Sequence, residues 1–408
     1  DVVSRMQDRD EAIDANLLGR LYQERGQALV LVSDDEAVHS NYEAMRTFAV
    51  QRQDRTLELA ALLSLCNLYG QYTSLFNPLK ATETAQEALA LAREVGDTAA
   101  EARALWGLMI VEVTAIGDNN LGMSYGRQAL ALARELGLTE LVGHILNGLW
   151  GPFFAQNQIE QALEALSEAQ SIWRELGNLQ RLAEASRFMA IINSGIGDHR
   201  CILAEAPELV ELGASIGSRF DMAQGSIYLA IAHARQGHFG QALAYTEKVG
   251  ALSAAIGHAM DEHLHQYTRI VLYLAVGAWA EADHWADSLY AERETMVPAI
   301  IHLNLAFIAL AWVAYGKLDE GQAILDELLP TLPADTTVAF AIIPIIIAYG
   351  HLHLALGKPE ALFAGLEERV RPFREAGFIR LLADEYWLRG RAEMALGHYD
   401  AAREALLK

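Results

Sequence analysis

The sequence predicts an all-α protein, a right-handed α-α superhelix (solenoid) of about ten helical hairpins. A helix-ending residue recurs about every 40 residues, and a second series recurs at the same interval about 20 residues out of phase. Two turns in each period mean two helices in each repeat. No stretch of alternating polar and apolar residues bounded by turn residues indicates a strand.

The first series ends the first helix of each hairpin. Gly and Asn tolerate the left-handed backbone conformation in which many helices end. The first turns are expected near Asp34, Asn77, Gly117, Asn157, Gly197, Gly237, Gly277, Gly316, Gly357 and Gly397. The second series consists of Gly96, Gly137, Gly177, Gly217, Gly257 and, three periods later, Gly377.

The segments that precede the second-series glycines are rich in helix formers. Residues 88–96 read ALALAREVG, residues 129–137 read ALALARELG and residues 169–177 read AQSIWRELG. Ala, Leu, Arg and Glu favour helix, and an arginine near the C-terminal end interacts favourably with the helix dipole. We expect each segment to be the second helix of its hairpin, ended by its glycine.

Small residues keep a constant phase around the first turns, so the paired helices are expected to approach closely. They lie five residues after the turn at Gly122, Ala162, Ala242, Ala282 and Ala402, and seven before it at Ala190, Ala230, Ala309, Gly350 and Gly390. Stacked hairpins of this kind bury a continuous core between neighbouring repeats. The polar segment at residues 8–17, DRDEAIDANL, is typical of the end of an array.

The composition excludes several classes of protein. With 52% hydrophobic residues and only two cysteines, the chain is neither collagen-like, nor disordered, nor a disulfide scaffold. Its net charge of −22 would repel a phosphate backbone, which argues against direct contact with nucleic acid. The longest apolar run, residues 338–349, is too short for a membrane span and contains Pro344. We expect a cytoplasmic protein without a membrane contact.

The pattern around the first turns resembles the tetratricopeptide repeat (TPR). Gly390, Gly397 and Ala402, in LRGRAEMALGHYDAA, carry it best, although the period is about 40 residues rather than 34. Long-period arrays with segments such as ALALARELG and EAGFIRLLADEYWLRGRAEMALGHYDAA resemble the C-terminal superhelical regions of bacterial multidomain signalling ATPases. Those proteins include the large ATP-binding LuxR-type transcriptional regulators. We therefore expect residues 1–408 to be a single superhelical domain and an excised part of a larger protein.

The sequence contains no phosphate loop and no HExxH. GxSxG occurs at residues 122–126 and 213–217, but no predicted strand precedes either stretch, as the nucleophile elbow of that motif requires. On a helix, His263 and His265 would lie about 200° apart and could not chelate one metal. His258 and Glu262 could pair at i,i+4, which leaves a metal site there as the weaker alternative to local hydrogen bonding and surface polarity. We predict no enzyme activity, no cofactor and no metal.

The concave face is the candidate binding surface, because the first helix of each hairpin lines it in arrays of this type. The inward positions lie about 13, 10, 6 and 3 residues before the turn. Repeats two to six then present a polar strip with a Glu184–Arg187 pair, and repeats eight and nine present an apolar strip. The polar candidates for ligand binding are Ser64, Asn67, Gln71, His144, Asn147, Glu184, Arg187 and Gln224. Ordinary solvated helix faces at one end and core at the other remain the alternative interpretation.

The apolar strip, together with the isoleucine-rich helix beside it, is the candidate for docking or self-association. A helix that is apolar on all sides is buried or lies in an interface. The interface candidates are Leu303, Leu310, Ile342, Ile346, Ile347 and Leu354. The seven tryptophans fall at unrelated phases, which favours packing between helices over an aromatic cage.

These features favour a non-catalytic sensor or interaction region of a cytosolic bacterial signalling or transcription regulator. It would bind a partner protein, a peptide or a small inducer on its concave face. One alternative is a structural scaffold that assembles protein partners or copies of itself into a homo-oligomer. Another is a receptor for a peptide pheromone, because such receptors also use long helical repeats.

Overall fold

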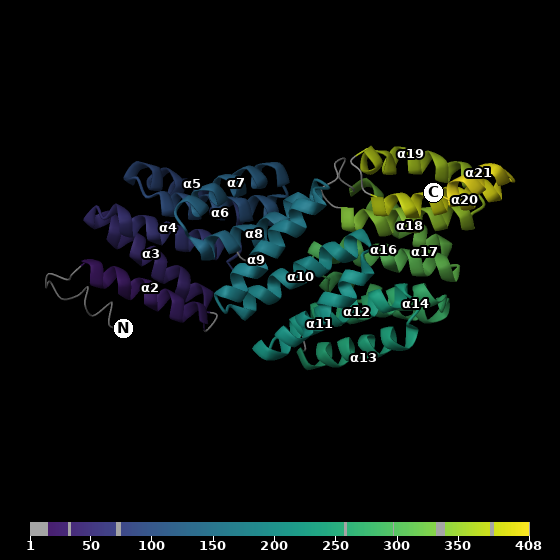
Figure 1. Cartoon of the computed structure of the whole chain (residues 1–408), viewed down its shortest axis with the longest axis horizontal. Coiled ribbons are helices and arrows are strands. Elements are labelled where there is room, and N and C mark those ends of the chain that lie inside the picture. Colours follow the sequence, from purple (N-terminus) through teal and green to yellow (C-terminus); the bar gives the residue numbers. More distant parts are fainter. Residues whose placement is uncertain are drawn as a thin grey trace. The chain divides into compact units, whose positions relative to one another are not determined.

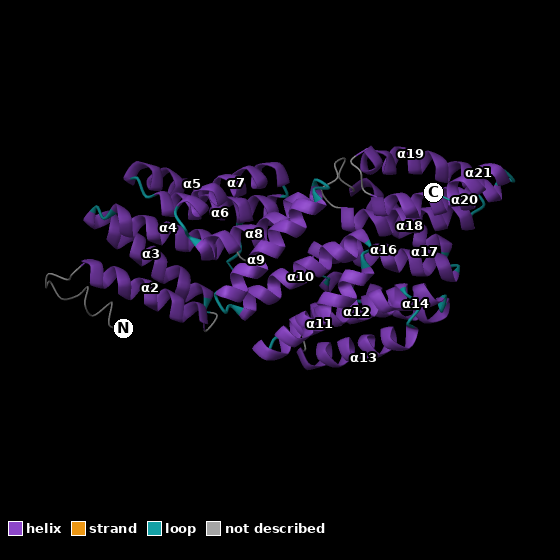
Figure 2. Cartoon of the chain, viewed as in Figure 1, coloured by secondary structure: helices purple, strands orange, loops and turns teal. Residues whose placement is uncertain are grey.

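The computed structural model describes residues 15–31, 34–70, 75–256, 259–296, 298–331, 339–375 and 379–407. Over these residues the chain folds into 20 α-helices that pack one after another in hairpins (Figures 1 and 2). The prediction of an all-α solenoid of helical hairpins is confirmed. Within these ranges, no helix is both long enough and apolar enough to cross a membrane.

The chain forms two compact units, Asp1–Pro152 and Phe153–Lys408, and each is described by itself. The expectation of a single domain over residues 1–408 stays a prediction. The helices that begin in unit 1 are α2 (Ala15–Leu31), α3 (Asp35–Arg52), α4 (Arg55–Gly70), α5 (Pro78–Val95), α6 (Thr98–Val111), the π-helical turn η1 (Glu112–Ile116), α7 (Asn119–Glu135) and α8 (Thr139–Ala155).

Unit 2 contains the longer described stack of hairpins. Its helices are α9 (Ile159–Glu175), α10 (Leu179–Ile196), α11 (His199–Ile216), α12 (Arg219–Arg235), α13 (Phe239–Ile256), α14 (Ala259–Val276), α15 (Trp279–Ala291), α16 (Pro298–Tyr315), α17 (Leu318–Leu328), α18 (Ala339–Ala355), α19 (Pro359–Glu375), α20 (Ile379–Ala395) and α21 (Tyr399–Leu406). The short 3₁₀ turns η2 (Arg293–Thr295) and η3 (Leu329–Thr331) follow α15 and α17.

The helices of unit 2 form an inner and an outer layer. Each even-numbered helix from α10 to α18 contacts the next even-numbered helix, and each also contacts its odd-numbered hairpin partner. Helix α10 in addition contacts α20, the last inner helix. The six inner helices therefore enclose a common space, and the odd-numbered helices cover their outer side.

The turns are built as the glycine series predicts. Positive φ values occur at Gly117, Gly197, Gly237 and eight further glycines, and at Asn157 with φ 58°. The prediction for Asn77 is wrong, because its φ is −149° and its side chain caps the start of α5 by accepting from the Lys80 N–H. Asp34 likewise begins α3 rather than ending a helix. Gln53, which the periodicity does not single out, takes the left-handed conformation after α3. Gly257 and Gly377 lie outside the described residues.

Asp, Asn and Ser side chains begin several of the helices that follow these turns. The carboxylate of Asp198, directly after Gly197, accepts from the Cys201 N–H at 3.0 Å at the start of α11. The Ser218 hydroxyl oxygen accepts from the Asp221 N–H at 3.2 Å at the start of α12. Each contact satisfies a backbone donor that the first turn of a helix leaves free.

Small residues hold the paired helices together closely, as predicted. Ala162, Ala242, Ala282 and Ala309 are completely buried. At Gly321, five residues after Gly316, an added methyl group would lie 3.4 Å from the carbonyl oxygen of Ala309 on the facing helix. The tightest backbone approach is at Gly213 of α11, where an added methyl group would lie 2.7 Å from the backbone nitrogen of Met222.

We predict that Asp198→Ala lowers the free energy of unfolding by about 1 kcal/mol at neutral pH, because α11 loses its N-cap. The hydrogen bond from the Cys201 N–H lowers the pKa of Asp198 below its ordinary value of 3.8. Its contribution is therefore present above pH 3.8 and is lost as the pH falls through the lower, folded-state pKa. Denaturant unfolding at pH 7 and pH 3 measures both effects. Asp198→Asn keeps a capping oxygen and should show neither effect.

We predict that Gly213→Ala lowers the free energy of unfolding by roughly 1–3 kcal/mol, because the added methyl group forces α11 away from α12. Gly240 in the first turn of α13 is the matched control, since an added methyl group there has no neighbour within 4 Å. Gly240→Ala should be neutral or stabilising by up to about 1 kcal/mol. Equal effects of the two substitutions in urea unfolding would contradict this account of the packing.

Candidate functional site

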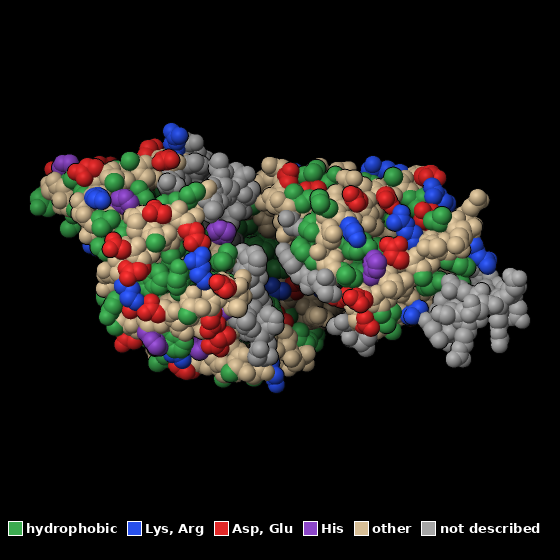
Figure 3. All heavy atoms as spheres, turned by 180° about the vertical axis from the view of Figure 1, so that it is seen from behind, with side chains coloured by type: hydrophobic (Ala, Val, Ile, Leu, Met, Phe, Trp, Pro, Cys, Tyr) green, Lys and Arg blue, Asp and Glu red, His purple; other side chains and the backbone are tan. Residues whose placement is uncertain are grey.

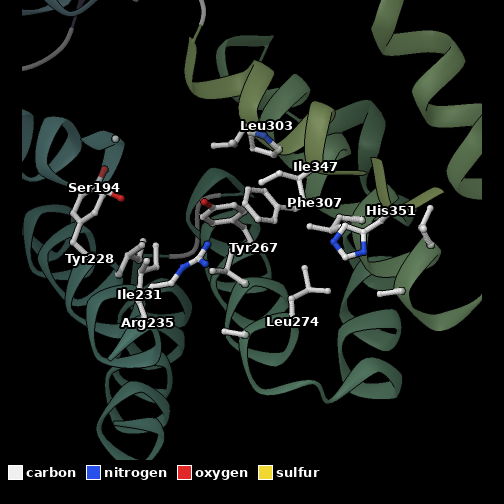
Figure 4. Close-up of a pocket in the computed structure, with 18 of the residues that line it drawn as sticks. Ser194, Tyr228, Ile231, Arg235, Tyr267, Leu274, Leu303, Phe307, Ile347 and His351 are labelled. Atoms are coloured by element: carbon white, nitrogen blue, oxygen red, sulfur yellow. The ribbon is translucent and has the colours of Figure 1, made fainter. Parts of the chain in front are cut away.

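The inner helices of unit 2 enclose a cavity of about 1030 Å³, and side chains from all six of them, α10 to α20, line it (Figure 4). Small-molecule sites usually occupy about 300–1,000 Å³, so this space is at the upper end of that range. All its lining residues belong to unit 2.

The lining residues repeat with the 40-residue period. On α16 the cavity is lined by Leu303, Phe307, Leu310 and Val313, which lie 13, 9, 6 and 3 residues before Gly316. On α14 the lining residues Leu264, Tyr267, Val271 and Leu274 lie 13, 10, 6 and 3 residues before Gly277. These spacings place the side chains on one face of each helix, because a helix has about 3.6 residues per turn.

One part of the wall is aromatic and aliphatic. The rings of Tyr267 and Phe307 meet edge to face with their centroids 5.2 Å apart. Leu303, Ile347 and Leu274 also line the cavity (Figure 4). Tyr228 lines it as well, and burial raises the pKa of its phenol, so the hydroxyl stays protonated at neutral pH. This part of the wall offers apolar contact and a few hydroxyl groups.

Arg187 of α10 is held in a defined position. Its guanidinium lies over the rings of Phe188 and Phe220, with its central carbon 4.9 and 5.3 Å from the ring centroids. Its Nε lies 3.5 Å from Oδ1 of Asp221. That nitrogen is buried and has no hydrogen-bond partner among the described residues. Cation–π contacts and an ion pair together restrict the side chain.

His351, Trp387 and Arg391 form a second polar group, on α18 and α20. The imidazole of His351 stacks near the Trp387 ring at 5.1 Å between centroids, and Arg391 lies over the same ring at 5.2 Å. Burial and the neighbouring Arg391 lower the pKa of His351. The imidazole is therefore neutral at pH 7 and can both donate and accept a hydrogen bond.

The cavity brings together six of the residues that the sequence selects. Both strips contribute to it, the polar one through α10 and α12 and the apolar one through α16 and α18. These residues are Arg187, Gln224, Leu303, Leu310, Ile347 and Leu354. That they bind a ligand stays a prediction.

The other polar candidates lie elsewhere. Ser64, Asn67, His144 and Asn147 belong to unit 1, and Gln71 lies outside the described residues. Asn147 is only 5% exposed, so its side chain faces the core rather than an open groove. Glu184 accepts a hydrogen bond from Arg181 at 2.9 Å, whereas Arg187 pairs with Asp221, so the partners differ from the expected Glu184–Arg187 pair.

In the isoleucine-rich helix α18, the interface candidate Ile346 is not exposed, and self-association through this helix stays a prediction. Ile346 is only 2% exposed and packs in a core with Leu362, Leu366 and Leu388. It is buried because it faces away from the cavity, toward the neighbouring helices. The side chain of Ile342 lies outside the described residues.

Several lining residues are absent from the sequence-based selection. They are Tyr228, Tyr267, Arg235, Trp279, Trp387 and Arg391. The same register would have selected Tyr267 and Trp387, ten residues before Gly277 and Gly397, and Arg391, six residues before Gly397. Trp279 and Trp387 line the cavity and are 45% and 39% exposed, so these two side chains are not fully packed between helices. Trp173, in contrast, is completely buried.

The histidine cluster on α14 is part of the packing. His263 is completely buried, with its Nε2 3.1 Å from Oε2 of Glu292. His265 is 8% exposed and its Nε2 accepts from the Arg269 Nε at 2.8 Å. The expectation of surface polarity is therefore wrong for both side chains. Among the described residues no group of three or more His, Cys, Asp or Glu could hold a metal ion.

Comparisons with known proteins reveal similarity in structure only. No protein-family model matches the sequence, and neither does any curated protein. The crystal structure of aspartyl phosphate phosphatase F from Bacillus subtilis is similar over 80% of this chain and 86% of that chain, with a TM-score of 0.56 and 14% identity. The crystal structure of a Rap protein complexed with competence and sporulation factor is similar over 97% of both chains, with a TM-score of 0.51 and 12% identity.

At these identities the likeness concerns the fold. The chain has a TPR-like helical-hairpin fold of the kind seen in Rap proteins. The finer resemblance, to the superhelical regions of multidomain signalling ATPases, stays a prediction.

We predict that Arg391→Gln raises the pKa of His351, because the substitution removes the nearby positive charge that disfavours the imidazolium. The pKa should remain below the ordinary value of 6.5, since burial is the larger cause of the shift. A histidine titration followed by NMR measures this change. Arg403→Gln, on the outer helix α21, should leave the pKa of His351 unchanged.

Proposed function

We propose that this chain is a receptor that binds a short peptide in the cavity of unit 2. The observation that carries the proposal is the partly enclosed cavity that six consecutive inner helices line. Its wall combines apolar and aromatic side chains with separated hydrogen-bonding groups, among them Ser194, Gln224 and Tyr267. An extended peptide needs both, because its side chains seek apolar contacts and its backbone seeks hydrogen-bond partners.

The comparisons support this proposal over a sensor region attached to an ATPase. One of the similar structures is a Rap protein complexed with competence and sporulation factor, and the similarity covers 97% of both chains. The likeness therefore favours the alternative of a peptide receptor. An attached regulator module and a cytoplasmic location stay predictions.

We propose further that the chain acts by binding rather than by catalysis. No pair of carboxylates and no nucleophile with an adjacent base is present among the described lining residues. The phosphatase activity in the name of one similar protein belongs to that protein, since 14% identity carries the fold alone. A bound peptide would contact several repeats at once and could change the curvature of the inner layer, which a partner protein would detect.

An equimolar library of random hexapeptides tests this proposal. We expect a subset to co-elute with the protein in size-exclusion chromatography, identified by mass spectrometry of the protein peak. Ala314→Trp should lower this retention by about tenfold, because the indole fills part of the cavity. Ala251→Trp, on the outer helix α13, is the control and should retain the same peptides as the parent chain.

Retention of no peptide by the parent chain would overturn the proposal. Equal retention by the parent and the Ala314→Trp variant would place the binding outside this cavity.

A further inference from the structure

The charge of the cavity is opposite to the charge of the chain. The charged residues that line it are Arg187, Arg235 and Arg391, and none of its described lining residues is Asp or Glu. The chain as a whole has 53 acidic residues against 31 basic ones. If residues lined the cavity in proportion to their numbers in the chain, acidic residues would outnumber basic ones there. The presence of three arginines and no described carboxylate therefore needs an explanation.

Arginines of unit 2 that do not line the cavity commonly have a carboxylate partner. Arg174 donates to Glu208 at 3.0 Å, and Arg293 donates to Glu327 at 2.8 Å. Arg269 of α14 donates to Glu247 at 2.7 Å. In Figure 3 acidic and basic side chains lie beside one another over the visible surface. A protein rich in carboxylates readily supplies such partners.

Arg235 and Arg391 differ from these arginines. Neither forms an ion pair with any residue that the structure describes. Arg391 lies over the Trp387 ring at 5.2 Å. Arg235, the last residue of α12, extends toward Tyr267 (Figure 4). Both guanidinium groups therefore keep hydrogen-bond donors available at the cavity.

Arg187 adds a third positive group, only partly compensated. Asp221 lies 3.5 Å away, which is longer than a charge-assisted hydrogen bond of about 2.7–2.9 Å. Arg187 lies ten residues before the glycine that ends its helix, Arg391 six residues and Arg235 two residues before theirs. The three arginines therefore occupy different levels of the inner layer. Helices α12 and α20, which carry Arg235 and Arg391, both contact α10, which carries Arg187.

The repulsion between three cations around one partly enclosed space costs free energy. An anion bound between them would remove this cost and would be held by planar groups suited to carboxylates. Because the arginines lie at different levels of the inner layer, they fit a ligand with several carboxylates better than a ligand with one. Because the rest of the wall is mostly apolar, the complementary molecule also carries apolar groups.

We propose that the ligand of this cavity is an acidic peptide, a short chain of apolar residues with two or more Asp or Glu side chains whose carboxylates Arg235 and Arg391 bind. This inference rests on the proposed function and names the class of peptide. Complementary charge also excludes competitors, since peptides rich in Lys or Arg would meet three positive groups without counter-charges.

Two synthetic hexapeptide pools test this inference. Both contain Leu, Ile, Phe, Val and Tyr at four randomised positions, and they differ only in two fixed positions, which are Glu in one pool and Gln in the other. We expect the parent chain to retain the Glu pool at least about tenfold better in size-exclusion chromatography, since each charge-assisted hydrogen bond is worth roughly a factor of ten or more. The preference should weaken at high salt.

The double variant Arg235→Gln/Arg391→Gln should lose this preference while it retains the Gln pool as well as the parent chain does. The matched control Arg200→Gln/Arg403→Gln removes the same charge from exposed positions on the outer helices α11 and α21 and should keep the preference. Circular dichroism and thermal unfolding verify that all variants are folded. Arg391→Lys keeps the charge without the planar fork and should show an intermediate preference.

Equal retention of the two pools by the parent chain would overturn the acidic-peptide inference and leave the proposed peptide receptor intact. Retention of neither pool by the parent chain, in an experiment where the random library is also not retained, would overturn both. Loss of the preference in the control variant would attribute the effect to overall charge, which also overturns the inference.

Discussion

The architecture depends on a backbone constraint at the end of each inner helix, where one residue takes positive φ. Gly197, Gly237, Gly277, Gly316, Gly357 and Gly397 meet this constraint at nearly equal spacing. Each fixes where its helix ends and therefore which side chains face inward, because an α-helix rotates by about 100° per residue. Since the spacing is conserved along the chain, equivalent faces of successive inner helices line one space.

Close packing then decides which side chains are available for binding. Small residues such as Ala282 and Ala309 allow each hairpin to close tightly, and large side chains fill the space between repeats. Alternate faces of one helix can thus have opposite roles. On α18, Ile347 lines the cavity, whereas Ile346, one residue earlier, lies in the core.

The sequence predicts the helical repeats and the inward register well, because both depend on local preferences of Gly, Asn and Ala. The site is predicted less completely. The register includes Tyr267 and Arg391, but their role depends on which inner helices meet in space, and no local pattern records the contact between α10 and α20. The burial of Asn147 and Ile346 depends on neighbouring helices in the same way. Asn77 was misassigned because Asn suits both ends of a helix.

The contact between α10 and α20 has a consequence for the order of folding. The other main contacts of the inner layer join helices that are neighbours in the stack, so they form over short chain separations. The contact between α10 and α20, called the seam below, joins helices that are five repeats apart. Its formation therefore costs more loop-closure entropy than a contact between neighbouring inner helices. Hairpins should therefore form first, the stack next and the seam last. By the same reasoning the seam is the first contact to open, and a molecule could enter or leave the space inside without disturbing any single repeat.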